Sequence, residues 1–173
     1  MKIARLLIFC LSFLEWSCQS QSDTPETIAI SGITQRNQFG NLVGTADNDD
    51  WITESSWPTL VSSQFNFSDT LNYAVNNEIG TINTIFAYPN PATTQFMFGI
   101  SSSKPTIMKY ILVDNQLNVL LQGTFRLKNS NFIVAIDFSD PKLVTGKTYR
   151  LYYAFYDKNK AIYAKGHGDI EKK

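Results

Sequence analysis

The sequence predicts an all-β fold, an immunoglobulin-like seven-stranded β-sandwich with a short N-terminal helix packed on it and a disordered tether before it. Three observations lead to this class. Residues 84–173 contain seven short apolar segments separated by turn residues, several of these segments alternate between apolar and polar positions, and no helix-length pattern interrupts them. Seven short strands with this spacing are typical of an immunoglobulin-like sandwich.

The amino-acid composition limits the classes of protein to which this chain can belong. Asn, Ser and Thr together make up a quarter of the 173 residues, whereas charged residues make up only 17%. A polar but weakly charged, aromatic-rich chain is typical of an exported β protein. The formal net charge is zero, so there is no basic field that would attract nucleic acid, and no run of about 20 apolar residues could span a membrane.

Residues 1–17 have the pattern of a signal peptide, with Lys2 and Arg5 before the apolar run 6–14. Cys18 follows the small residue Ser17, and this junction resembles the lipobox of bacterial lipoproteins. The resemblance implies that Cys18 is acylated and anchors the protein to a membrane. The alternative is an ordinary secretory signal that leaves Cys18 as a free thiol.

Residues 18–50 and 51–83 form two further regions. The first is polar, with few large apolar residues, and is expected to be a flexible, lipidated tether. The second contains Trp57, Leu60, Val61 and Phe65 at helical spacing, which predicts a short amphipathic helix with Pro58 in its first turn and Ser55 or Ser56 as its cap. Three large aromatic residues of this region need a partner for burial, and the downstream sandwich is the large partner available. They are Trp51, Trp57 and Phe65.

Charge is distributed unevenly between the two halves of the chain. Residues 19–83 contain eight acidic residues and one basic residue, whereas residues 84–173 contain twelve basic and six acidic residues. This asymmetry suggests that the acidic segment folds back on the basic half. Chance clustering is the alternative, because a surface ion pair contributes little to stability.

The β domain, residues 84–173, carries the predicted strands. They are 84–88, 95–100, 106–113, 119–123, 131–138, 148–156 and 161–165. Alternation assigns one apolar face of four of these strands to the core. The inward residues are Phe96, Phe98, Met108, Tyr110, Leu112, Phe132, Val134, Ile136, Phe138, Tyr149, Leu151, Tyr153 and Phe155, with Lys109 and Arg150 on the opposite faces.

Residues 88–92 read Tyr-Pro-Asn-Pro-Ala at the start of this domain. Two prolines end a strand, and Asn90 between them can cap its own backbone. With the alternating strands that follow, the motif resembles the type A C-terminal sorting domains of Bacteroidota type IX secretion substrates. The chain as a whole, with Asp49-Asp50-Trp51, Trp57 and the ending at residues 165–170, looks more like a small Bacteroidota envelope lipoprotein. Neither resemblance implies a catalytic activity.

Candidate chemical sites are few. His167 is the sole histidine and lies between two glycines, which indicates an exposed loop imidazole rather than a catalytic base. One histidine cannot supply a zinc site, and no cofactor is expected. Asp47, Asp49 and Asp50 are weak calcium candidates, with a solvated acidic run as the alternative.

Two surface features complete the candidates. Arg150, Tyr152 and Tyr156 share the outward face of one strand and could bind a sugar or a peptide, unless the helix of residues 51–65 covers them. Thr70 follows Asp69 and precedes Leu71, a pattern similar to O-glycosylation sites of exported Bacteroidota proteins.

Two functions follow from these expectations. The first is a non-catalytic outer-membrane lipoprotein, periplasmic or surface-facing, with a protein or glycan partner in the envelope. The second is type IX secretion cargo whose C-terminal domain is a sorting signal. A small hydrolase using His167 is a third and weaker hypothesis.

Overall fold

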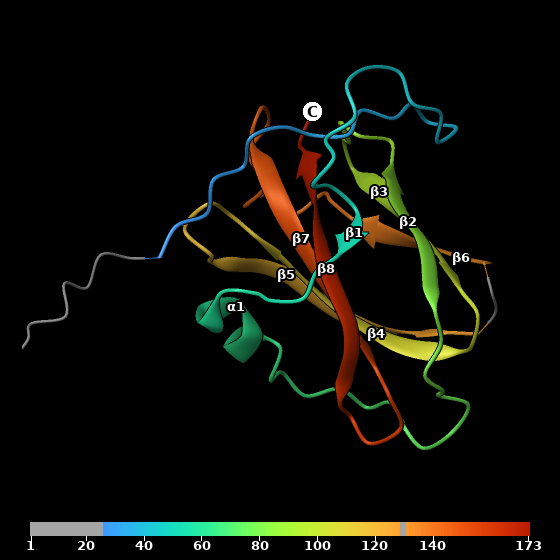
Figure 1. Cartoon of the computed structure of the whole chain (residues 1–173). Coiled ribbons are helices and arrows are strands. Elements are labelled where there is room, and N and C mark those ends of the chain that lie inside the picture. Colours follow the sequence, from blue (N-terminus) through green and yellow to red (C-terminus); the bar gives the residue numbers. More distant parts are fainter. Residues whose placement is uncertain (1–25, 129–130) are drawn as a thin grey trace, which may run out of the picture.

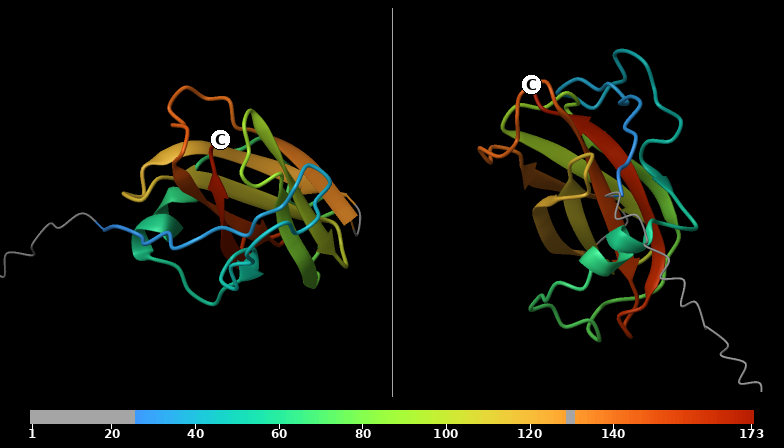
Figure 2. Two further views of the ribbon diagram at one scale, coloured as in Figure 1. Left: turned by 90° about the horizontal axis from the view of Figure 1, so that it is seen from above. Right: turned by 90° about the vertical axis from the view of Figure 1, so that its left-hand side faces the viewer.

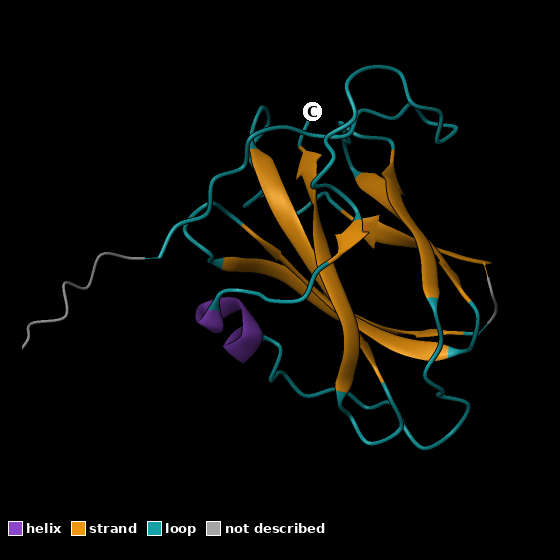
Figure 3. Ribbon diagram, viewed as in Figure 1, coloured by secondary structure: helices purple, strands orange, loops and turns teal. Residues whose placement is uncertain are grey.

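The computed structural model describes residues 26–128 and 131–173, and strands dominate them (Figures 1 and 3). The elements are β1 (Ile52–Thr53), α1 (Thr59–Gln64), β2 (Ile82–Tyr88), β3 (Gln95–Ser102), β4 (Thr106–Val113), β5 (Val119–Leu127), β6 (Asn131–Asp137), β7 (Thr148–Tyr156) and β8 (Ile162–Glu171). The all-β class is therefore confirmed. The predicted signal peptide and Cys18 lie outside the described residues.

The strands form two antiparallel sheets. The larger sheet has the order β1-β8-β7-β4-β5, and the smaller has the order β2-β3-β6. The described residues contain eight strands where seven were predicted, and each predicted segment overlaps one of β2 to β8. The additional strand, β1, has two residues, which is too short to show any periodicity. It exists because Ile52 and Thr53 pair with His167 and Gly166 of β8.

The core lies between the two sheets and consists of the residues that alternation assigned to it. Eleven of the thirteen predicted inward residues are buried, and Phe132 and Val134 are half-buried against the same cluster. Trp51 joins this cluster from outside the predicted sandwich, with 6% of its surface exposed and its ring 6.1 Å from that of Phe98. The core is therefore built from both the β domain and the acidic segment.

A second apolar cluster lies on the outer face of the larger sheet, where α1 and the residues after it cover β4 and β7 (Figure 2). Val61, Phe65 and Tyr73 are buried there against the strands. The prediction of a helix packed on the sandwich is confirmed. We call residues 58–77 the cover segment. No helix among the described residues is long and apolar enough to cross a membrane.

The predicted details of the helix need correction. Pro58 occupies the N-cap position and no side chain caps the first turn, so neither Ser55 nor Ser56 has the predicted role. Leu60, expected on the buried face, is 39% exposed. The helix has only six residues, so Trp57 and Phe65 lie outside it and stack on each other with ring centroids 4.8 Å apart.

Residues 26–57 run along the outside of the sandwich, and we call them the strap (Figure 1). The N–H of Ile28 donates to the carbonyl of Asn115, and Arg36 and Asn90 exchange two backbone hydrogen bonds of 2.9 Å each. The prediction of a flexible tether up to residue 50 is therefore wrong for residues 26–50. Polar backbone and side-chain bonds hold this part in place, and these bonds leave no hydrophobic pattern in the sequence.

Candidate functional site

The Asp50 carboxylate joins the strap to the last strand. One oxygen accepts the backbone N–H of Asp169 at 2.7 Å, and the other accepts the N–H of Thr34 at 2.7 Å. Burial raises the pKa of Asp50 to about 6, and the charge of Asp169 acts in the same direction. The two backbone donors act against this rise. Asp50, itself a residue of the strap, is thus a structural acceptor that binds another part of the strap and β8.

Asn90 occupies the centre of the same contact. Its side-chain Nδ2 donates to the carbonyls of Thr34 at 3.1 Å and Asp169 at 2.8 Å, and its Oδ1 accepts the N–H of Glu171. The sequence suggested that Asn90 caps its own backbone, and this is wrong. The amide instead binds the strap and β8, so the residue between the two prolines connects three segments of the chain.

Two glycines of β8 allow the strap to approach closely. A Cβ atom at Gly166 would lie 1.9 Å from the carbonyl oxygen of Ile52, and one at Gly168 would lie 2.3 Å from the ring of Trp51. Trp51 has a φ of 60°, a conformation that is strained for a residue other than glycine. The predicted loop at residues 165–170 is therefore part of β8, and its glycines provide space for residues 51–52.

His167 is buried in β8, not exposed in a loop as predicted. Its Nδ1 lies 2.8 Å from Oε2 of Glu54, which also accepts the indole N–H of Trp57 at 3.0 Å. Burial alone would raise the pKa of Glu54, but the hydrogen bonds and charge of His167 and the bond from Trp57 together lower it. The imidazole thus holds the end of the strap against β8.

The His167–Glu54 pair resembles the histidine and carboxylate of a catalytic triad, so its surroundings matter. A cavity of about 240 Å³ beside the pair is lined by Ser31 as well as Arg150 and Asp169. Ser31 makes no hydrogen bond to His167, and neither does any other hydroxyl or thiol in the described part of the chain. The pair therefore has the histidine and the carboxylate of a triad, but no nucleophile is hydrogen-bonded to the histidine.

The predicted binding stripe on β7 is not an open surface. Tyr152 and Tyr156 are buried, because Trp57 contacts Tyr152 edge-on at 5.4 Å and Tyr73 contacts Tyr156 at 5.9 Å. Arg150 is bound to both carboxylate oxygens of Asp169 at 2.7 Å. Burial of this stripe, which the sequence offered as the alternative, is therefore the arrangement present, but the covering residues Trp57 and Tyr73 flank α1 and do not belong to it.

The weak calcium candidates do not converge. Asp47 Oδ1 accepts the N–H of Asp49, and both oxygens of Asp50 accept backbone N–H groups. Among residues 26–128 and 131–173, no group of three or more His, Cys, Asp or Glu side chains is arranged to hold a metal ion. Asp47 and Asp50 instead act as acceptors of backbone N–H groups, Asp47 within its own turn and Asp50 between the strap and β8.

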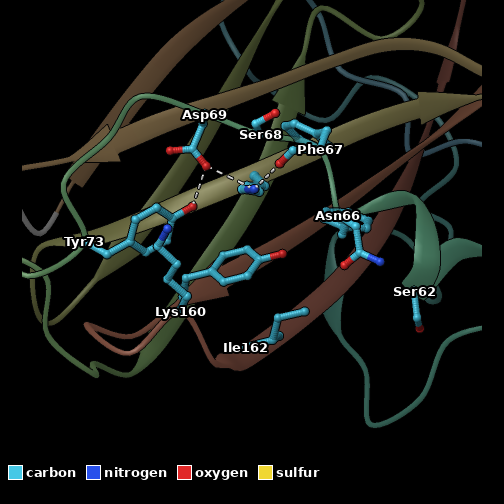
Figure 4. A pocket seen from close by; sticks show the side chains of 11 residues that line it. Ser62, Asn66, Phe67, Ser68, Asp69, Tyr73, Lys160 and Ile162 are labelled. Carbon is cyan, nitrogen blue, oxygen red and sulfur yellow. Dashed lines mark hydrogen bonds and ion pairs between the residues drawn. The ribbon is translucent and has the colours of Figure 1, made fainter.

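The cover segment forms one wall of an open cavity of about 580 Å³ over β4 and β7 (Figure 4). Asp69, Tyr73 and Lys160 lie on one side of it, and Asn66 and Ser62 lie on the other. Four aromatic residues line it together with these polar groups. They are Phe65, Phe67, Tyr73 and Tyr156.

A buried ion pair organises this cavity. The Lys109 ammonium lies 3.0 Å from Oδ2 of Asp69, donates to the carbonyl of Phe67 at 2.6 Å, and lies 4.5 Å from the centre of the Phe67 ring. Tyr73 donates its hydroxyl to Asp69 at 2.9 Å. Burial would raise the pKa of Asp69, but the bonds from Leu71 N–H, Lys109 and Tyr73 and the charge of Lys109 lower it.

The acidic and basic halves meet at specific contacts. Two of the three ion pairs that lysine and arginine form among the described residues join an acid of residues 19–83 to a base of residues 84–173. They are Asp69–Lys109 and Glu78–Lys104, and the contact between Glu54 and His167 joins the same two regions. The suggestion that the acidic segment folds back on the basic half therefore agrees with the fold.

The cavity was not predictable from the sequence. Lys109 was assigned to the outward face of β4, but its partner Asp69 lies 40 positions earlier in an irregular segment. The one signal in the sequence that could have indicated the buried ion pair is the presence of Lys109 in a strand that is otherwise mostly apolar. Thr70, the glycosylation candidate, is exposed in the loop beside Asp69.

Comparison with known proteins adds no relationship. No protein-family model matches the chain, and no curated protein matches it significantly.

Proposed function

We propose that the protein is a non-catalytic lipoprotein of the bacterial outer membrane, anchored through acylated Cys18, whose sandwich is a glycan-binding module. The observation that carries the binding role is the open cavity of about 580 Å³ under the cover segment. Its walls combine aromatic rings with hydroxyl, amide and ammonium groups, which is the combination that binds sugars through stacking and hydrogen bonds.

The arrangement of the polar groups supports a neutral or weakly acidic saccharide. Asp69 and Lys109 neutralise each other, which leaves Lys160 as the uncompensated charge of the lining. Asn66, Ser62 and Ser68 add polar side chains at the rim. A ligand rich in hydroxyl groups would form hydrogen bonds with these donors and acceptors. Because hydroxyl groups are uncharged, binding would not require a charged group of the ligand to lose its water.

A non-catalytic role is supported by the position of His167. Its Nδ1 faces Glu54, and Oε2 of Glu54 is also bound by Trp57. A hydrolase would need a nucleophile within hydrogen-bond distance of the imidazole, and Ser31 is not bound to it in the structure. If purified protein hydrolyses an ester or glycoside and His167→Ala abolishes that activity, the non-catalytic proposal is wrong.

The immunoglobulin-like assignment is part of the proposal, and the strand order supports it. With β2 to β8 numbered one to seven, the sheets have the orders 1-2-5 and 7-6-3-4. Constant-type immunoglobulin domains have 1-2-5-4 and 7-6-3. The two arrangements differ in the fourth strand, here β5, which pairs with β4 instead of β6.

The alternative function, type IX secretion cargo, is favoured by the Tyr88–Ala92 motif at the end of β2. In that case the sandwich would be a sorting signal, and it would be cleaved from the functional part of the protein. The intact mass of the protein from the membrane fraction of its host separates the two proposals. A chain beginning at Cys18 with a diacylglyceryl group and still containing Lys173 is the expected result. An unacylated chain that lacks the domain after Ala87 would instead identify cargo.

Sugar binding is tested separately by isothermal titration with oligosaccharides released from the envelope of the same host. We expect Lys160→Ala and Asn66→Ala each to weaken binding about tenfold, because each removes a polar contact of the rim. Lys158→Ala is the matched control, since Lys158 is exposed on the same turn but does not line this cavity. Equal losses in all three variants, or no binding by the unaltered protein, would contradict the proposal.

A further inference from the structure

One turn of the strap is apolar and exposed. Phe39 has 75% of its surface accessible, more than any other large apolar side chain in the described part of the chain, and Leu42 and Val43 have 51% and 58%. Residues 37–44, which we call the apolar loop, contain no charged residue and project from the upper right of the molecule in Figure 1. Single exposed apolar residues are common on protein surfaces, whereas three within five positions form a patch that indicates an interaction site.

The turn of the apolar loop satisfies its own backbone donors. Oδ1 of Asn37 accepts the N–H groups of Phe39 and Asn41 at 2.9 Å and 3.1 Å. The N–H of Gly40 donates to the carbonyl of Asn37, and the N–H of Asn37 donates to the carbonyl of Asn41. A segment that enters the boundary between lipid headgroups and acyl chains loses water from its backbone, and N–H groups that are already bonded lower this cost. The turn can therefore leave water with these N–H groups bonded.

The apolar loop and the loop between β6 and β7 lie at one end of the sandwich. The apolar loop follows the bridge between Arg36 and Asn90, just past the end of β2. The loop of residues 139–147 returns to the end of β8, where its last two residues exchange backbone hydrogen bonds with Lys172. A bridge between Ala92 and Lys172 joins the two places. We call this end of the sandwich, at the top of Figure 1, the strap end.

A second apolar side chain is exposed at the strap end. Val144, in the loop between β6 and β7, has 54% of its surface accessible. Exposed Lys142 and Lys147 flank it, and Asp137 and Asp140 lie just before them, so the charges here balance. The exposed apolar side chains, not a net charge, therefore determine what the strap end can bind.

The opposite end of the sandwich presents a different surface. Ile79 and Val75 are exposed there by 64% and 50%, but Glu78 precedes Ile79 and lies 3.3 Å from Lys104. Entry into a bilayer would take this ion pair out of water, which is costly. The same end carries the turn between β7 and β8, where Lys160 lines the cavity of about 580 Å³. Of the two ends, the strap end is thus the one with an apolar patch free of charge.

The proposed acyl anchor would hold the strap close to lipid. Glu26 follows Cys18 by eight residues, and eight residues span at most about 29 Å. Ile28 is bonded to Asn115, and the strap then continues over the sandwich to the apolar loop. An acyl chain on Cys18 would raise the effective concentration of lipid around this loop, so that even a weak insertion would persist. This step rests on the proposed function, whereas the exposure and the hydrogen bonds of the loop do not.

We propose that the apolar loop inserts into a lipid bilayer, with Phe39, Leu42 and Val43 at the boundary between headgroups and acyl chains. The strap end then faces the membrane. Because β7 begins and β8 ends at the strap end, the turn between these strands points away from the bilayer. The cavity that Lys160 lines would therefore face away from the membrane, where a glycan can reach it.

The first test places a tryptophan at either end of the sandwich. The chain that begins at residue 18 contains every described residue and lacks the apolar run 6–14, which would itself bind lipid. Its sole cysteine, Cys18, can be coupled to a maleimide-bearing lipid in phosphatidylcholine vesicles. The added fluorescence of Phe39→Trp should shift to the blue and be quenched by brominated acyl chains. Ile79→Trp is the matched control, because Ile79 is 64% exposed at the opposite end, and its added fluorescence should be unquenched.

The second test needs no anchor. The same chain with Cys18→Ser should bind phosphatidylcholine vesicles weakly in a sedimentation assay, and Phe39→Ser should weaken this binding at least about tenfold because it removes the largest apolar group of the contact. Ile79→Ser should leave the binding unchanged. Binding should also be the same at low and high salt, since no net charge contributes to it.

Two results would overturn the insertion of the apolar loop. They are equal quenching of the Phe39→Trp and Ile79→Trp variants, and vesicle binding that is absent or is unchanged by Phe39→Ser. Failure of the proposed anchor gives a different result. In that case the intact mass of the protein from its host lacks an acyl group, while the chain with Cys18→Ser still binds vesicles through Phe39.

Discussion

The side-chain Nδ2 of Asn90 lies 2.8 Å from the carbonyl oxygen of Asp169, so a residue enclosed by two prolines at the end of β2 is bound to the last strand. The same amide binds Thr34 of the strap and Glu171 of β8. Asn90 is completely buried, so water cannot replace these bonds. This contact explains why an asparagine is needed between the prolines.

We expect Asn90→Ala to lower the free energy of unfolding by about 3 kcal/mol, because each buried group left without a partner costs about 1–3 kcal/mol. Urea denaturation followed by circular dichroism measures this loss. Asn118→Ala is the control, since the Asn118 side chain is exposed and bonds only to Asp114 in a turn. A loss no larger than that of the control would show that the Asn90 bonds contribute little.

Gly168→Ala should release the strap from β8. The added methyl group would overlap the Trp51 ring, which must then leave the core or push the strands apart. Limited proteolysis should show faster cleavage within residues 26–57, together with a lower melting temperature. Gly146→Ala is the control because nothing lies near its Cβ, although its φ of 78° makes alanine strained. That variant should lower stability by about 1 kcal/mol without exposing the strap.

Asp50 should make stability fall as pH rises through the acidic range. Its pKa is raised to about 6 in the folded protein from an ordinary value of 3.8, so the folded state binds this proton more tightly than the unfolded state. The contribution is complete below pH 4 and is lost as pH rises through 6. Asp50→Asn removes this dependence.

Thermal unfolding across this range provides the measurement. The stability of Asp50→Asn relative to the unaltered protein should increase between pH 4 and pH 7 by on the order of 2 kcal/mol. Asp49→Asn, which changes an exposed neighbouring carboxylate, is the matched control. A constant difference between Asp50→Asn and the unaltered protein would contradict the prediction.

Asp69 and Lys109 should behave as a coupled buried pair. Asp69→Asn and Lys109→Met each leave a polar partner without its counter-charge, and we expect each to cost about 3 kcal/mol. The double variant should cost clearly less than the sum of the two. Chemical denaturation of all four proteins gives the coupling energy.

The pair of Glu78 and Lys104 serves as the comparison, because more than half of each side chain is exposed. Glu78→Gln should change stability by less than about 0.5 kcal/mol. If the losses of stability in Asp69→Asn and Lys109→Met add up to the loss in the double variant, the pair does not organise the cavity wall.

The seven longer strands and the inward faces of four of them were predictable from the sequence, because each strand satisfies a local rule. Alternation along β3, β4, β6 and β7 places one apolar face toward the core whatever the rest of the chain does. The helix near Val61 was predictable in the same way, from residues within one or two turns of each other. Boundaries and caps were less predictable, since Pro58 took the place expected of a serine.

Tertiary structure alone decided the strap, β1 and the cavity. Asp50 binds Asp169, Asn90 binds Thr34, and Lys109 binds Asp69, and in each pair the partners are separated by between 40 and 119 positions. Hydrogen bonds and ion pairs of this kind leave no periodic pattern, because a single residue on each side makes them. A sequence records which faces are apolar, whereas the fold determines which polar groups meet once those faces are buried.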